Sequence, residues 1–282
     1  MAGAGMNNIK ARIKSVKSTM QITGAMELVA TSKLRRFKER VERTRPFYET
    51  LGGAISEVIA AAELTDSPYV KKKEGRPRLI VVIAGDRGLA GGYNTNVYRL
   101  AASLAGEGDV ILPIGKKACE YYKHKGASVF GASVSDVTSL GVGDALALGE
   151  CITEAYLSGE FGEVLVIYTR FVSMLTQSPV YERLLPLSLD KEREDASLPE
   201  CDMEPEEMLD SIVPRYVGGV LYAAISEALA SESGARRTAM NSANKNAKEM
   251  IDGLMLSYNR ARQAIITQEI TEIVSGAEAL ST

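Results

Sequence analysis

The sequence contains no tryptophan, one histidine and three cysteines. Cys119, Cys151 and Cys201 lie far apart and form no Cys-x-x-Cys pair, and His124 is the one imidazole available to join them. This pattern predicts neither a zinc site nor a disulfide framework. We therefore expect no bound metal and a reducing compartment.

Long hydrophobic runs are also missing. No segment approaches the roughly 18 apolar residues that a membrane span requires, and the N-terminal stretch MAGAGMNNIK has no apolar signal core. We expect any contact with a membrane to be made through partner proteins.

Charge is nearly balanced overall but unevenly distributed. The formal net charge of −3 argues against a chain that is basic throughout. Residues 10–45 hold eleven basic against three acidic side chains, and residues 190–210 hold ten acidic against two basic ones. The basic stretch 32–45 fits nucleic acid, an acidic protein surface, or a solvated helix face on which Glu39 and Glu42 form local pairs; we favour the protein surface.

Apolar residues recur with the 4-3-4 spacing of a coiled coil in both terminal segments. The repeat is carried by Ile9, Ile13, Val16 and Met20, and by Ala247, Ile251, Leu254, Tyr258, Ala261 and Ile265. The first set predicts a helix over residues 7–63, about 85 Å long, with a kink at Pro46. The second predicts a helix of about 100 Å with Pro214 in its first turn and its end near Leu280. Such long helices are expected to pair antiparallel, with the region of Met20 beside that of Ile265.

The middle of the chain has a different pattern. The apolar runs at 79–84, 109–114 and 163–171 alternate with helical stretches, which predicts a parallel sheet with crossover connections. Residues 179–189 are predicted to add an edge strand, and the acidic residues 190–210 a loop. We expect an α/β domain over residues 76–204, inserted between helical arms at 1–75 and 205–282.

A glycine-rich stretch, GDRGLAGGYN at residues 85–94, follows the first predicted strand, where phosphate-binding loops are found. It lacks the Gly-Lys-Ser/Thr ending of such loops and does not match G-x-G-x-x-G. A tight turn needs glycines with or without a ligand, so a structural turn is the favoured interpretation. His124 is interpreted as a solvated helix residue, and no catalytic pair or triad is evident. We expect no cofactor and no catalytic residue.

Residues 20–34, MQITGAMELVATSKL, carry apolar side chains on every side of the predicted helix, and Glu27 is the one charge from Ser18 to Ser32. A helix that is apolar all round is enclosed, and a single partner helix cannot enclose it. Residues 264–280 have the same character. We expect both helix ends to be sheathed inside other subunits.

Several motifs resemble those of the gamma subunit of the rotary proton- or sodium-driven ATP synthases. They are ITGAMELVATSKLRR, DRGLAGGYN, ARRTAMNSANKNA and YNRARQAIITQEITEIVSGAEAL, and in this order they span essentially the whole chain. The resemblance implies an α/β fold in which the terminal helices form a long antiparallel coiled coil around an inserted Rossmann-like α/β domain. In that family the glycine-rich loop binds no nucleotide in the catalytic cycle.

The resemblance also implies a function. The chain would be a non-catalytic, rotating central-stalk subunit that transmits torque between the ion-driven membrane ring and the catalytic hexamer. Its partners would be the alpha and beta subunits, the epsilon subunit and the membrane rotor ring, with no nucleic acid and with membrane contact only through these partners. The sequence has no inserted cysteine pair of the kind that lets chloroplast relatives respond to thiols. A bacterial, peripheral protein at the cytoplasmic face of the plasma membrane is therefore expected.

By the same resemblance, Lys33, Arg35 and Arg36 would lie near an acidic loop of beta, with Met26 close by. Polar contacts to the surrounding sleeve would come from Arg236, Arg262, Gln263 and Thr267. Gly24 departs from the family pattern, which has lysine there, and glycine costs a helix about 1 kcal/mol relative to alanine.

Two other classes of function stay open on the residues alone. A nucleotide-dependent enzyme would use the α/β domain and would bind ATP or NAD when purified by itself. A free-standing coiled-coil or nucleic-acid-binding scaffold would be a well-behaved monomer or homodimer without other subunits.

Overall fold

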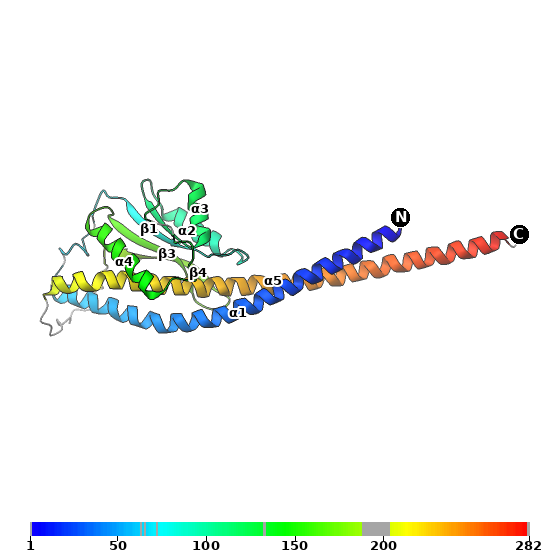
Figure 1. Cartoon of the computed structure of the whole chain (residues 1–282), viewed down its shortest axis with the longest axis horizontal. Helices are drawn as coiled ribbons and strands as arrows, with labels where there is room; N and C mark the ends of the chain where they lie inside the picture. The colour runs from blue at the N-terminus through cyan, green and yellow to red at the C-terminus, as the bar shows by residue number, and fades with distance from the viewer. Residues whose placement is uncertain are drawn as a thin grey trace. The chain divides into compact units, whose positions relative to one another are not determined.

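The computed structural model of the chain describes residues 2–62, 64, 66–71, 73–131, 134–187 and 204–280, without the side chains of 2–4 and 278–280. The elements are α1 (Ala2–Ala61), β1 (Arg78–Ile83), α2 (Tyr93–Leu104), β2 (Val110–Ile114), α3 (Lys116–Lys125), α4 (Val142–Leu157), β3 (Glu163–Phe171), β4 (Gln177–Leu185) and α5 (Pro205–Leu280), as labelled in Figure 1. The chain forms two compact units: Met1–Val29 with Arg237–Thr282 (the terminal unit), and Ala30–Arg236 (the α/β unit).

The sheet of the α/β unit has the strand order β2-β1-β3-β4. Strand β1 runs parallel to β2 and to β3, whereas β4 is antiparallel to β3. The predicted parallel sheet with one added edge strand is therefore confirmed. Strand β1 is central because its sequence RLIVVI is a continuous apolar run, the kind of strand that is buried on both faces.

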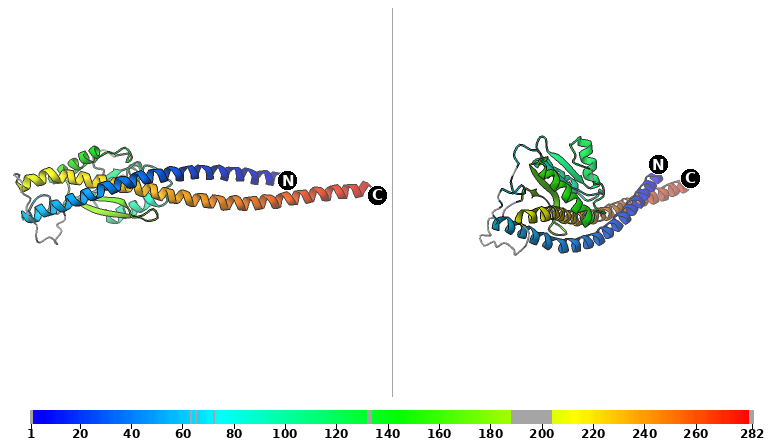
Figure 2. Two further views of the ribbon diagram at one scale, coloured as in Figure 1. Left: turned by 90° about the horizontal axis from the view of Figure 1, so that it is seen from below. Right: turned by 60° about the vertical axis from the view of Figure 1, so that its left-hand side comes forward.

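Helices cover both faces of this sheet (Figures 1 and 2). On one face Leu79 and Val81 pack in a core with residues of α1, α4 and α5. On the other face Ile80 and Val82 pack against α2 through Val97, and against α3. Successive residues of a strand point to opposite faces, so the one run of β1 supplies both cores.

Within the α/β unit, α1 and α5 run antiparallel and approach closely. The ring of Tyr48 in α1 lies so near Gly219 of α5 that an added Cβ there would be 1.7 Å from the ring. Tyr216 of α5 lies in the same way beside Gly52 of α1. As the number rises along α1 it falls along α5, which fixes the direction of the pairing.

Within the terminal unit, a polar cluster joins the same two helices. The Thr23 hydroxyl donates to the side-chain oxygen of Asn244. The amide nitrogens of Asn241 and Asn244 donate to the Glu27 carboxylate over 3.0 and 3.1 Å. The sole charge of the predicted apolar stretch is thus bonded inside the unit.

Some expectations for the long helices were wrong in detail. Helix α5 begins at Pro205, which takes the first-turn position itself, so Pro214 lies inside the helix. Residues 205–210 are therefore helical rather than a loop, and residues 190–203 lie outside the described part of the chain. Helix α1 does continue through Pro46 as a single helix, as expected, but it begins at Ala2 rather than at residue 7. Because Thr23 lies beside Asn244, the region of Met20 is not opposite that of Ile265, since an apolar repeat indicates a face but not a register.

Candidate functional site

The glycine-rich loop lies at the carboxyl end of β1, between β1 and α2. In open α/β sheets this is where ligands bind, in the crevice beyond the carboxyl ends of the strands. Its position is the one that a nucleotide-binding loop would have. Whether a phosphate fits depends on what already occupies the crevice.

The Asp86 carboxylate already occupies an anion position in this crevice, at the amino end of α3. It accepts the backbone N–H of Lys116, the first residue of α3, at 3.1 Å, and those of Val137 and Thr138 at 3.1 and 3.4 Å. A helix N-terminus with neighbouring N–H groups is the usual phosphate site of such folds. Here the chain supplies its own anion, and a phosphate would meet a negative charge.

Helix α5 adds a second carboxylate to the same crevice. Glu232 lies against Gly85, and its side chain is only 8% exposed. Beside it, a cavity of about 490 Å³ is lined by the loop, by α1 with Lys33 and by α5 with Arg236. The site resembles a junction between helix and sheet more than a ligand pocket.

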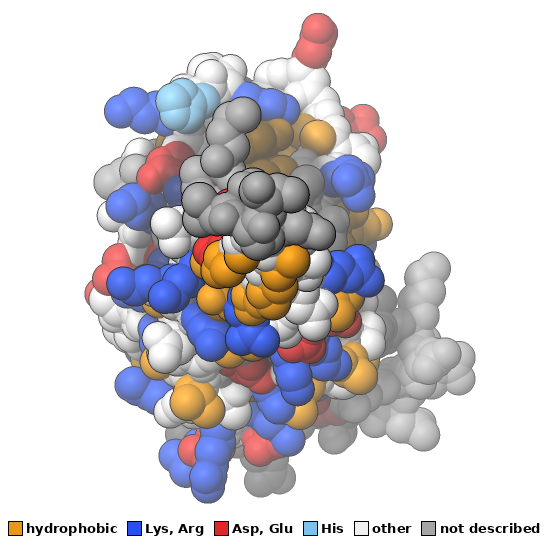
Figure 3. All heavy atoms as spheres, turned by 90° about the vertical axis from the view of Figure 1, so that its right-hand side faces the viewer, with side chains coloured by type: hydrophobic (Ala, Val, Ile, Leu, Met, Phe, Trp, Pro, Cys, Tyr) orange, Lys and Arg blue, Asp and Glu red, His pale blue; other side chains and the backbone are white. Residues whose placement is uncertain are grey.

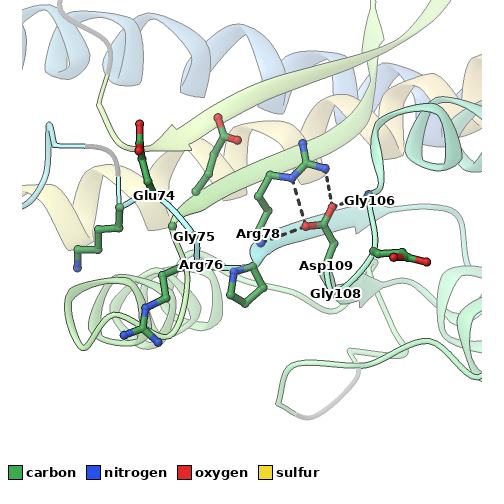
Figure 4. A pocket seen from close by; sticks show the side chains of 12 residues that line it. Glu74, Gly75, Arg76, Arg78, Gly106, Gly108 and Asp109 are labelled. Atoms are coloured by element: carbon green, nitrogen blue, oxygen red, sulfur yellow. Dashed lines mark hydrogen bonds and ion pairs between the residues drawn. The ribbon is translucent and has the colours of Figure 1, made fainter.

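A second cavity, of about 810 Å³, lies at the amino ends of β1 and β3 (Figure 4). Its centre is an ion pair between Arg78 and Asp109, 2.6 Å apart. The Gly106 N–H donates to the same carboxylate over 2.7 Å, and Lys73 donates to the last carbonyls of α4. The principal charges of this cavity thus hold the ends of strands and loops together. Within the described ranges of the chain, no group of three His, Cys, Asp or Glu side chains could hold a metal.

The predicted contact residues of the terminal unit lie at its surface. Met26 is half-buried, and Arg262, Gln263 and Thr267 are exposed on α5. The Thr267 hydroxyl donates to the Gln263 carbonyl over 2.9 Å. At Gly24 an added Cβ would come only within 3.8 Å of Asn244, so packing inside the chain does not require glycine there.

Apolar side chains are exposed along both helices of this unit. Between 45% and 73% of each of the following residues is exposed: Ile22, Leu28, Val29, Ile266, Ile270, Ile273 and Val274. Figure 3 shows apolar side chains lying among lysines and arginines on one face of the molecule. Each long helix thus leaves apolar surface that its partner does not cover, which is typical of an interaction surface. Across the described helices, none is long and apolar enough to cross a membrane.

The predicted basic contacts of the α/β unit differ in exposure. Arg35 and Arg36 are exposed, and Lys33 is half-buried. Arg35 pairs with Glu39 at 3.4 Å, with 87% and 54% of the two side chains exposed. Such an exposed pair contributes little, about 0.3–0.5 kcal/mol, so it competes weakly with a partner.

The interpretation of the basic stretch as a locally paired face is confirmed in part, because Lys38 also pairs with Glu42 at 3.4 Å. His124 is exposed, as expected. Sequence reasoning missed that Arg45 leaves this face and binds Glu227 of α5 at 2.6 Å. The signal was two glutamates in the otherwise apolar and small-residue run ISEALASES, where a buried carboxylate needs a partner.

Comparisons with known proteins give matches that extend along nearly the whole chain. The family model described as ATP synthase matches residues 5–280. The ATP synthase gamma chain of Ruminococcus albus is 46% identical over 97% of this chain and 98% of that protein. The chain belongs to the ATP synthase gamma-chain family. It is thus a subunit of ATP synthase and takes part in ATP synthesis and ion transport.

A second relative, the sodium ion specific ATP synthase gamma chain of Acetobacterium woodii, is 38% identical over 98% of this chain and 99% of that protein. A rotor chain in the structure of the Euglena gracilis mitochondrial ATP synthase has 19% identity and a TM-score of 0.68, covering 94% of this chain and 99% of that one. A chain in the central stalk and c-ring structure of the Tetrahymena thermophila enzyme has 23% identity and a TM-score of 0.62, covering 79% and 99%. The fold is that of a central-stalk subunit.

Proposed function

We propose that the chain rotates inside a catalytic hexamer of alpha and beta subunits and transmits torque between that hexamer and an ion-driven membrane ring. The observation that carries the proposal is the exposed apolar surface on both helices of the terminal unit. Apolar surface is unfavourable in water, so it is stable only when surrounding subunits form a sleeve that covers it. Because apolar contacts are non-directional, such a sleeve permits the two helices to turn within it.

The remaining partners follow from family membership. The epsilon subunit and the membrane ring bind the α/β part of the chain, and the membrane is reached only through them, with no role for nucleic acid. The bacterial sources of the relatives support a peripheral protein at the cytoplasmic face of the plasma membrane. The α/β domain at 76–204 is an insertion between arms 1–75 and 205–282, which form an antiparallel coiled coil.

The chain itself is non-catalytic. ATP chemistry takes place on beta, as the family resemblance implies. The carboxylates of Asp86 and Glu232 in the crevice of the α/β unit support this proposal, because a phosphate there would meet negative charge. No lysine and hydroxyl follow the glycines, as they do in a phosphate-binding loop.

Asymmetry provides the mechanism. Two helices inside a sleeve of threefold repetition present a different face to each beta subunit, so rotation changes the balance of open and closed states at each catalytic site. Moving a site from 1:99 to 99:1 requires about 5.5 kcal/mol of differential contact energy. Distributed apolar contacts and a few charges supply this contact energy without holding the helices at one rotary angle.

Seven residues are assigned to these contacts. Lys33, Arg35 and Arg36 face an acidic loop of beta, with Met26 close by. Arg262, Gln263 and Thr267 face the sleeve, whereas Arg236, which the family resemblance also places there, is 12% exposed and ion-paired with Glu232. The high exposure of Arg35 and Arg36 supports the first group.

The test changes Lys33, Arg35 and Arg36 together to glutamine, which keeps helix propensity nearly constant and removes three charges. The hexamer should still assemble on its apolar sleeve, but fewer ions should be pumped per ATP hydrolysed in reconstituted vesicles. High salt should partly reproduce the defect in the parent, since it screens exposed charges.

The matched control changes three exposed basic residues of α2 and α3, Arg99, Lys123 and Lys125, to glutamine. It removes the same charge from a different surface and should leave the ratio of pumping to hydrolysis unchanged. An unchanged ratio in the first variant at low salt would show that the basic cluster is a solvated face only.

A further inference from the structure

We propose that the loop of residues 85–92 is a socket for Glu232 and Arg236 of α5, and that this socket makes the sheet turn together with the long helix. The proposal rests on the rotary function above, because it names contacts through which torque passes between helix and sheet. The loop socket consists of Gly85, Arg87 and Gly88 on one side and the two α5 side chains on the other.

The shape of the loop fits the glutamate. A Cβ added at Gly85 would lie 2.7 Å from both the carboxyl carbon and Oε1 of Glu232, closer than real contacts allow. At Gly88, in the same loop, no atom lies within 4 Å of an added Cβ. Glycine at the first position thus leaves the space that the carboxylate occupies, and a larger residue there would require the Glu232 side chain to move.

The arginine closes the socket. Nη2 of Arg236 lies 2.5 Å from Oε1 of Glu232, and the two side chains are 12% and 8% exposed. The same guanidinium donates to the carbonyl oxygens of Arg87 and Gly88 over 3.3–3.4 Å. These bonds are long and individually weak, but they come from one rigid, planar group that is held in place by the glutamate.

Neighbouring residues of α5 are fastened to the sheet in the same way. The Tyr93 hydroxyl, at the start of α2, donates to the Ala228 carbonyl over 3.0 Å, and the Ser231 hydroxyl donates to the Thr169 carbonyl over 3.0 Å. Burial, and then the nearby Glu232 carboxylate, raise the pKa of the Tyr93 hydroxyl well above its ordinary value, so it remains a donor. The start of α2 and the carboxyl-terminal part of β3 are thus both bonded to one stretch of α5.

Buried polar bonds suit a joint under torque. An apolar contact of similar area would stabilise the packing equally well, but it tolerates small shifts of one surface along the other. The ion pair between Glu232 and Arg236 lies within α5, so a shift of α5 along the sheet would keep that pair intact. The same shift would break the bonds from the guanidinium to the Arg87 and Gly88 carbonyls and would move the glutamate away from the space at Gly85. The loop socket therefore fixes the register of α5 on the sheet.

Two other roles for these residues predict different results. A site for a bound anion would need a positively charged side chain that is not already paired, but the Arg236 guanidinium in this crevice is paired with Glu232. A direct contact between Arg236 and the sleeve, as expected from the family resemblance, would depend on the arginine and not on the buried glutamate. The loop socket requires both residues equally, together with the space at Gly85.

The experiment uses the complete ATP synthase in vesicles, carrying Glu232→Gln, Arg236→Gln, both changes, or Gly85→Ala. Each should lower the number of ions pumped per ATP hydrolysed, and the double variant should be no worse than the single ones because the residues act as one unit. Amides of residues 85–92 should exchange hydrogen about tenfold faster, as expected for loss of a charge-assisted bond. Glu249→Gln on the exposed face of α5 and Gly143→Ala in α4, where an added Cβ has no atom within 4 Å, are the controls and should match the parent.

A defect in Arg236→Gln with parental behaviour in Glu232→Gln and Gly85→Ala would overturn the loop socket in favour of the direct sleeve contact. A parent complex that does not pump at all would instead contradict the proposed rotary function. Should Glu232→Gln fail to assemble while Glu249→Gln assembles, Arg236→Lys carries the test. It keeps the charge but loses the planar fork, so its loop exchange should lie between those of the parent and Arg236→Gln, and parental exchange would count against the socket.

Discussion

At Gly219, α5 carries no side chain because the Tyr48 ring of α1 occupies the space. Gly219→Ala should therefore destabilise the chain by about 1–3 kcal/mol through overpacking, which outweighs the helix-propensity gain of about 1 kcal/mol. Gly253→Ala, in the same helix with no atom within 4 Å, should be neutral or stabilising. Urea unfolding of the full chain compares the two, and a stabilised Gly219→Ala would refute the close packing of Tyr48.

The Asp109 carboxylate makes the stability of the sheet depend on pH. Burial by itself raises its pKa, but hydrogen bonds from the Arg78 side chain and from the Gly106 and Arg78 backbones outweigh this effect and hold the pKa below its ordinary value. The contribution of the ionised Asp109 carboxylate to folding stability is therefore complete above its ordinary pKa of about 3.9. This contribution is lost as the pH falls through the lowered pKa of the folded state.

Asp109→Asn should consequently lower the urea midpoint at pH 7 and make it less dependent on pH below about 4. Glu107→Gln, which removes a carboxylate from the same loop, is the control and should keep the parental pH dependence. Equal pH slopes in parent and Asp109→Asn would mean that the ion pair with Arg78 does not contribute to folding.

At the scale of elements, the pairing of the long helices is set by polar residues within the terminal unit. Thr23→Cys with Asn244→Cys should form a disulfide on mild oxidation, since these side chains are in contact. Met20→Cys with Ile265→Cys should not. Electrophoresis without reductant distinguishes them, after replacement of the natural cysteines by serine, and the reverse pattern would mean that the register of α1 on α5 is wrong.

The elements themselves were largely predictable. Continuous apolar runs identified β1 and β3 to within one or two residues, because a doubly covered strand has little else in its sequence. The start of α5 was missed because two prolines, Pro205 and Pro214, compete for the first-turn position and local preference cannot choose between them.

The candidate site was predictable only in part. The glycine-rich loop was correctly placed after β1, but its content was not foreseen, since Glu232 reaches Gly85 from a helix about 150 residues away in the sequence. Nothing local at Gly85 indicates that carboxylate. Long-range polar contacts of this kind depend on the register of helix on sheet, which spacing alone does not determine.

At the scale of the whole molecule, the two units differ in how their helices are held and in what they expose. Within the α/β unit polar bonds fasten α5 to the sheet, whereas the terminal unit exposes several large apolar side chains among charged ones. A rotor requires this difference, because torque must pass through one region while the other turns against its surroundings.

The most direct test of the rotary function watches the chain turn. With the natural cysteines replaced by serine, His124→Cys on the exposed surface of α3 carries a visible probe while the catalytic hexamer is fixed to a support. On addition of ATP, we expect continuous rotation of the probe in one direction, which stops when the ATP is removed. A hexamer that keeps hydrolysing ATP with the chain bound while the probe stays still would contradict it.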